Sequence, residues 1–149
     1  MTQKQLEDYL WGAAQILRGM IDAADFKQYI FPLLFFKRVS DIWDEEYQEA
    51  LKLSDGDIDY AGFRENHRFQ IPDGCHWSDV RKTTVDIGKK LQNSLREIEK
   101  ANFELLHDVF GDAQWTNKER LSDALLRDLI EHFYKLPLGN SVAPADVLG

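Results

Sequence analysis

The chain has 149 residues, of which 44% are hydrophobic and 30% are charged, with a formal net charge of −8 and a single cysteine. This length suits one domain with its own core, and the apolar content excludes a disordered polypeptide. One cysteine excludes an internal disulfide, and no basic start with an apolar stretch marks a secretory signal, so we expect a cytoplasmic location.

The first predicted helix begins at a capping box. Thr2 and Gln5 stand three residues apart, so that each side chain can bind the backbone N–H of the other. The apolar positions then recur at spacings of three and four, at Leu6, Leu10, Ala13, Leu17 and Met20. This period predicts an amphipathic helix that ends near Gly19.

A second, longer helix is predicted from a cap at Asp22 or Asp25 to about Leu53. Its stretch 30–36 is apolar on every side, which predicts a central helix surrounded by other elements. Seven residues are too few for a membrane span, which needs roughly 20. Pro32 predicts either a kink or a helix that restarts with this proline in its first turn.

An irregular excursion is predicted over residues 54–78, where Asp, Gly and Pro replace the helical period. Within it, Phe69 and Ile71 alternate with polar neighbours and predict a short two-stranded hairpin. Ser78 is the predicted cap of a brief helix over 79–82.

Helical periodicity returns over Ile87 to Ala101, which predicts an amphipathic surface helix. A short apolar segment covers 102–111, and a last helix is predicted to open at Thr116 or Asn117 and to stop before Pro137. The fold class is therefore mainly α. We expect one domain over 1–149, a helical bundle around a central apolar helix, with a long irregular excursion that contains a small β-hairpin.

The sequence does not predict a metal site. Residues Asp55, Asp57 and Asp59 have the spacing that opens a calcium loop, but Tyr60 and Asn66 occupy positions where that loop needs Gly and Glu. An acidic turn is the better interpretation. Zinc ligation by His67, Cys75 and His76 is disfavoured, because structural zinc sites need four ligands in paired spacings.

Catalytic and cofactor sites are not predicted either. The sequence has no glycine-rich loop that could cradle a nucleotide or S-adenosylmethionine, and no nucleophile signature. The adjacent Glu45 and Glu46 lie in a polar helical stretch and are interpreted as solvated surface. We therefore expect the chain itself to be non-catalytic.

Charge is distributed unevenly along the chain. Residues 64–100 contain eight Lys and Arg against six acids, so the remaining segments carry the negative charge. Net negative charge opposes attraction to DNA phosphates, whereas this segment could make such contacts. The candidate DNA-contact residues are Arg64, Arg68, Arg81, Lys82, Lys89 and Lys90.

The run 22–41, DAADFKQYIFPLLFFKRVSD, resembles the signature of the N-terminal domain of the modification subunit (M, or HsdM) of type I restriction-modification systems. The resemblance extends over essentially the whole chain. One departure is Phe103, where relatives commonly carry Pro. Further matching positions are Leu10 to Ala14, Leu17 to Gly19, Phe69, Ile71 with Pro72, Trp77, Ile87 with Gly88, Leu91, Ile98 with Glu99, and Val109 with Phe110.

This resemblance implies a parent protein that transfers a methyl group from S-adenosylmethionine to adenine N6 in a bipartite site on double-stranded DNA. It implies partners as well: a specificity (S) subunit, a second M subunit and, for cleavage, a restriction (R) subunit. The catalytic domain, with its Asn-Pro-Pro-aromatic motif, is expected beyond residue 149, and residues 146–149 resemble the start of the segment leading to it.

The implied role of the domain is assembly and clamping of DNA, without a cofactor of its own. Two other classes stay open from the residues alone. One is a pure protein-docking module with an exposed apolar patch, and the other is an acidic DNA mimic that occupies a basic groove of its partner. Binding of DNA by this chain and by a longer one across a salt series would discriminate among them.

Overall fold

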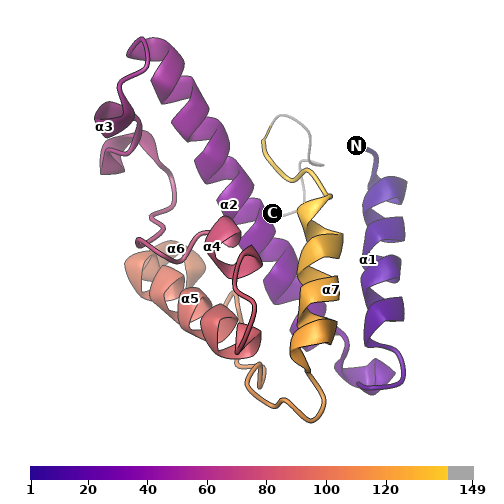
Figure 1. The fold of residues 1–149 in the computed structure, drawn as a ribbon. Helices are drawn as coiled ribbons and strands as arrows, with labels where there is room; N and C mark the ends of the chain where they lie inside the picture. The colour runs from indigo at the N-terminus through magenta and orange to yellow at the C-terminus, as the bar shows by residue number, and fades with distance from the viewer. Residues whose placement is uncertain (141–149) are drawn as a thin grey trace.

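Residues 1–140 are described in the computed structural model, and they form helices and turns without a β-strand (Figure 1). The mainly α fold predicted above is therefore confirmed, whereas the prediction on residues 146–149 lies outside the described residues. The helices are α1 (Gln3–Leu17), α2 (Lys27–Leu53), α3 (Ile58–Ala61), α4 (Trp77–Arg81), α5 (Ile87–Ala101), α6 (Phe103–Leu106) and α7 (Asp123–Tyr134), and 3-10 turns cover Ala23–Asp25 and Arg64–Asn66.

The start of α1 agrees with the predicted capping box. The backbone N–H of Gln5 donates to Thr2 Oγ1 at 3.1 Å, and that of Thr2 donates to Gln5 Oε1 at 2.8 Å. The prediction that Met20 continues the apolar stripe is wrong, because the helix ends at Leu17 and Met20 is exposed. Gly19, with a φ of 93°, turns the chain towards α2 at this point.

Helix α2 is the central helix, since α1, α3, α4 and α7 all pack against it (Figure 1). Leu33, Phe36 and Val39 are fully buried, although Phe31 remains partly exposed, so the apolar run is not enclosed on every side. Neither predicted cap is formed: the helix follows a 3-10 turn and begins at Lys27. Because five helical residues precede Pro32, the alternative of a restart at this proline is wrong.

Two glycines allow neighbouring elements to approach each other closely. A Cβ atom at Gly88, in the first turn of α5, would overlap the carbonyl oxygen of Trp115. At Gly12 in α1, a Cβ would lie 2.7 Å from Cε1 of His132, whose ring nitrogen is held 2.7 Å from the carbonyl oxygen of Tyr9. These positions bring α5 against the 113–122 connection and α1 against α7.

The predicted hairpin around Phe69 and Ile71 is wrong, although both side chains are buried as the alternation indicates. The amide of Asn102 takes the place of a neighbouring strand. Its Oδ1 accepts from the N–H of Gln70 and its Nδ2 donates to the Gln70 carbonyl, both at 2.7 Å. One side chain therefore satisfies both backbone groups that a β-ladder would pair.

Two helix starts also differ from the prediction. Helix α4 begins at Trp77 rather than after Ser78, because the Asp79 carboxylate accepts from the N–H of His76 at 3.1 Å. Helix α7 begins at Asp123, where Ser122 Oγ accepts from Leu125 N–H at 3.1 Å, and not at Thr116 or Asn117. The stretch 113–121 forms turns around the buried Trp115 instead.

Candidate functional site

The six predicted DNA-contact residues lie in three pairs. Arg64 and Arg68 line a groove of about 360 Å³ beside α6, together with Gln70 and Leu105. Lys89 and Lys90 lie on the first turns of α5, Lys89 exposed and Lys90 partly buried. The third pair, at the end of α4, lines a separate pocket, and neither this pocket nor the groove contains all six side chains.

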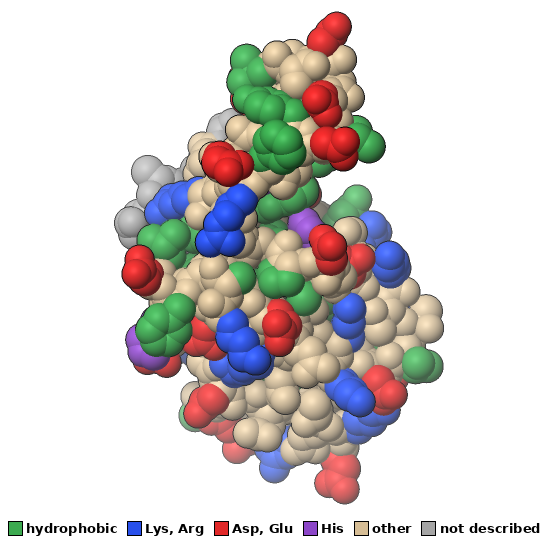
Figure 2. Space-filling model, turned by 90° about the vertical axis from the view of Figure 1, so that its left-hand side faces the viewer, with side chains coloured by type: hydrophobic (Ala, Val, Ile, Leu, Met, Phe, Trp, Pro, Cys, Tyr) green, Lys and Arg blue, Asp and Glu red, His purple; other side chains and the backbone are tan. Residues whose placement is uncertain are grey.

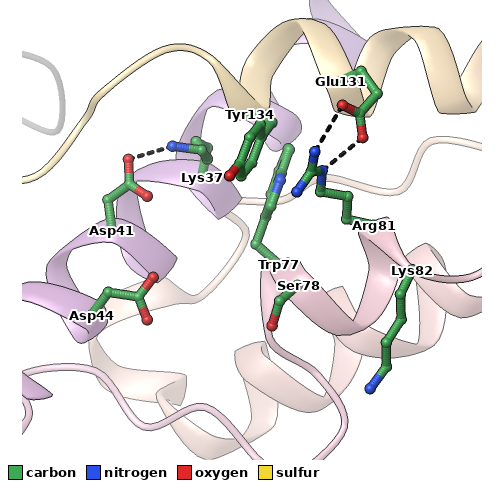
Figure 3. Close-up of a pocket in the computed structure, with 9 residues that line it drawn as sticks. All are labelled: Lys37, Asp41, Asp44, Trp77, Ser78, Arg81, Lys82, Glu131 and Tyr134. Atoms are coloured by element: carbon green, nitrogen blue, oxygen red, sulfur yellow. Dashed lines mark hydrogen bonds and ion pairs between the residues drawn. The ribbon is translucent and has the colours of Figure 1, made fainter.

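The α4 pair is already engaged within the protein (Figure 3). Arg81 donates through Nε and Nη2 to the two carboxylate oxygens of Glu131, at 2.7 and 3.1 Å, and its guanidinium lies 3.5 Å from the ring centroid of Tyr134. These hydrogen bonds lower the pKa of Glu131. Lys82 is exposed and lies 3.3 Å from Asp79. Arg81 is consequently less available to a phosphate than Lys82.

The pocket of about 490 Å³ beside this pair is an open cleft among α2, α4 and α7 (Figure 3). Its wall from α2 carries Lys37, Asp41 and Asp44, and the buried Trp77 closes the floor. Partial desolvation by these walls raises the pKa of Asp44, and the neighbouring Asp41 adds to the effect. Most of the lining charges are matched within the chain, so the pocket offers no concentrated charge to a small ligand.

The sequence did not predict a set of charged side chains that we call the α2 clasp: the buried Lys37 and Arg38 and the partly buried Asp41. These side chains hold the segment 136–140 that follows α7. Lys37 Nζ donates to the Leu136 carbonyl at 2.9 Å and to Asp41 at 2.5 Å, and Asp41 also accepts from the N–H of Leu138 at 2.9 Å. The charged i, i+4 pair directly after an apolar run was the available signal.

Arg38 completes the α2 clasp. Its Nη1 donates to the Leu138 carbonyl at 2.5 Å, and its Nη2 donates to Oδ1 of Asn140 at 2.7 Å. The side chain is only 8% exposed, and burial lowers its pKa from the usual value. Arg38 is thus a buried cation whose two Nη groups donate to oxygen atoms of the segment after α7. These hydrogen bonds hold that segment against the middle of α2.

The residues considered as metal ligands have other roles. Asp57 caps α3, because its Oδ1 accepts from the N–H groups of Asp59 and Tyr60 at 3.1 and 3.2 Å. His67 stacks on Trp43 with ring centroids 4.2 Å apart, while His76 contacts the same ring edge-on at 4.5 Å. Burial raises the pKa of the Cys75 thiol, which disfavours the thiolate that binds metals.

A different trio, Glu99, His107 and Asp108, has ligand atoms within 4.8 Å of one another. His107 and Asp108 are exposed, and Glu99 forms an ion pair with Arg96 at 2.8 Å.

Within residues 1–140, no helix has the length and apolar character that a membrane crossing requires.

The fold and these surfaces define an all-helical domain over its described residues, organised by one central helix, with most of its charged side chains on open faces and two of them buried in the α2 clasp. The chain belongs to the family of HsdM N-terminal domains, whose sequence profile matches residues 6–133. It is thus the N-terminal domain of a type I restriction-modification methyltransferase subunit. No curated protein matches the chain.

Proposed function

We propose that this domain serves assembly of a type I modification complex and forms one side of a clamp around DNA. The family match over residues 6–133 is the observation that carries this proposal. The parent subunit would transfer methyl from S-adenosylmethionine to adenine N6, in the cytoplasm, together with a second modification subunit and a specificity subunit. A restriction subunit would join the complex for cleavage.

The physical case for a clamp depends on effective concentration. A chain with a net charge of −8 binds DNA weakly alone, because its field repels phosphates. Once the other subunits hold the DNA, a few phosphate contacts suffice to close the clamp. Arg64 and Lys89 suit this role best, because they are exposed and form no ion pair within residues 1–140. Arg68, Lys82 and Lys90 would add to them, and Arg81 would contribute least.

A salt series on the assembled complex tests the clamp. Arg64→Ala with Lys89→Ala should weaken DNA binding and reduce the slope of log K against log salt by about 2, since each lost phosphate contact removes about 0.9. Arg81→Ala is the matched control, because its guanidinium is occupied by Glu131. Fluorescence anisotropy between about 50 and about 300 mM salt measures both quantities over the range where such contacts matter.

An unchanged slope in the double variant would contradict the clamp and favour a pure docking module. If DNA instead competes with the domain for a partner subunit, the domain acts as an acidic mimic.

A further inference from the structure

The far end of α2 projects from the body of the protein, and the chain turns there into α3 (Figure 1). Three large apolar side chains are open to solvent at this end: Leu53 is 72% exposed, Ile58 is 67% exposed and Phe63 is 51% exposed. We call them the α2 tip. Figure 2 shows hydrophobic side chains gathered on the projecting end of the molecule, with acidic side chains around them.

The exposure of the α2 tip is built into the local structure. The N–H of Gly56 donates to the Leu51 carbonyl at 2.8 Å, and Ser54 Oγ links the Ala50 carbonyl to the N–H of Asp57. Asp57 in turn caps α3. These bonds fix the turn that holds Leu53 and Ile58 outward, so their exposure is not the result of a frayed helix end.

The surroundings of the α2 tip are strongly acidic. Residues 44–65, which include the whole tip, contain eight acidic side chains against one lysine and one arginine. A groove of about 490 Å³ runs beside the tip, and Leu53 lies on its wall. The carboxylates that line the groove are those of Glu45, Glu46, Glu49 and Glu65.

We propose that the α2 tip docks on a protein surface in which apolar side chains are ringed by Lys and Arg. Apolar side chains gathered in one exposed patch, as on the projecting end in Figure 2, mark protein interfaces, and the acidic rim selects a basic partner. This rim, whose negative charge Arg64 next to Phe63 offsets only in part, disfavours DNA and anionic lipid at the tip, and it disfavours a second copy of the tip, because like charges would face each other. This inference rests on the assembly role proposed above and assigns it a surface.

Site-specific photo-crosslinking tests the docking surface. The full subunit, with p-benzoylphenylalanine in place of Ile58, is assembled with its specificity and restriction subunits, irradiated and analysed by mass spectrometry. Val85, which is 69% exposed in the connection between α4 and α5, is the matched control position. We expect cross-links from position 58 to one partner peptide that contains Lys or Arg beside aliphatic or aromatic residues.

A substitution experiment gives a second readout. Leu53→Ser with Ile58→Ser should lower the affinity for the cross-linked subunit about tenfold, as loss of a central apolar contact does in other interfaces. Val85→Ser should leave that affinity unchanged. Both variants should keep the fold, because the replaced side chains are exposed.

Cross-links no stronger than those from position 85 would overturn the inference, as would cross-links to DNA or to the α2 tip of another copy. Size-exclusion chromatography of the same samples separates the two proposals. If the complex assembles without tip cross-links, only the docking surface is wrong. If the subunits do not assemble at all, the proposed function fails with it.

Discussion

Asn102 is the residue on which the excursion depends. Its side chain is 7% exposed and makes three hydrogen bonds of 2.7 Å, two to the backbone of Gln70 and one to the Ile98 carbonyl. Asn102→Ala should lower the free energy of unfolding by about 2 kcal/mol, because the part-buried N–H and carbonyl of Gln70 lose their partner. Urea denaturation measures this loss. Asn93→Ala, at an exposed position of α5, is the control and should change stability little.

His76 should make stability depend on pH. Burial lowers its pKa below the ordinary value of 6.5, so the folded protein prefers the neutral imidazole. As pH falls through about 6.5, the unfolded chain takes up the proton first, and stability decreases. His76→Asn keeps a good helix cap for α4 and removes the titration. Its melting temperature should therefore fall less between about pH 7.5 and about pH 5.5 than that of the wild type, and equal decreases would contradict this assignment.

At the scale of whole elements, the long helices could be predicted and their connections could not. Helices α1, α2 and α5 repeat an apolar period over 15 or more residues, and burial of that stripe decides their structure. The prediction of a hairpin was wrong, because an alternating pattern shows only that one face of the segment is buried and does not show that a second strand pairs with it. Which group pairs with the backbone, here the amide of Asn102, is decided by a residue 32 positions away from Gln70.

The candidate site, like the fold, could be predicted only in part. The exposure of the basic residues could be predicted from their residue type. The ion pair between Arg81 and Glu131, 50 residues away, could not. The α2 clasp could not be predicted either, because Lys37 and Arg38 belong to residue types that normally lie on the surface. Their partners are carbonyl groups about 100 residues away, and backbone carbonyls have no sequence signature.

The α2 clasp should stabilise the segment after α7 more than the rest of the chain. Arg38→Ala removes donors to the Leu138 carbonyl and to Asn140, and should reduce the free energy of unfolding by about 2 to 3 kcal/mol. Arg38→Lys keeps the charge but cannot reach both acceptors, so we expect an intermediate loss. Hydrogen exchange should become faster at the Leu138 amide in both variants. Lys52→Ala, at an exposed position of the same helix, is the control.

The whole molecule separates its charge between two regions. The stretch 64–100 carries an excess of Lys and Arg, whereas the second half of α2 and its turn carry most of the negative excess. In the functions proposed above, the first region would meet DNA and the second would meet a basic protein surface. We expect the acidic region to limit DNA binding by the isolated chain, which gives the last prediction.

Neutralising that region should strengthen DNA binding at low salt without adding any contact. The variant combines Glu49→Gln, Asp55→Asn and Asp59→Asn, which removes three negative charges at exposed positions, and Asn tolerates the φ of 58° at position 55. We expect tighter binding of a DNA duplex at about 50 mM salt, because repulsion then acts over more than 10 Å. The gain should vanish at about 300 mM, where screening confines the field to the first shell of the surface. A gain that persists at high salt would mean that the substitutions create a direct DNA contact, and no gain at low salt would mean that the acidic end of α2 does not oppose DNA.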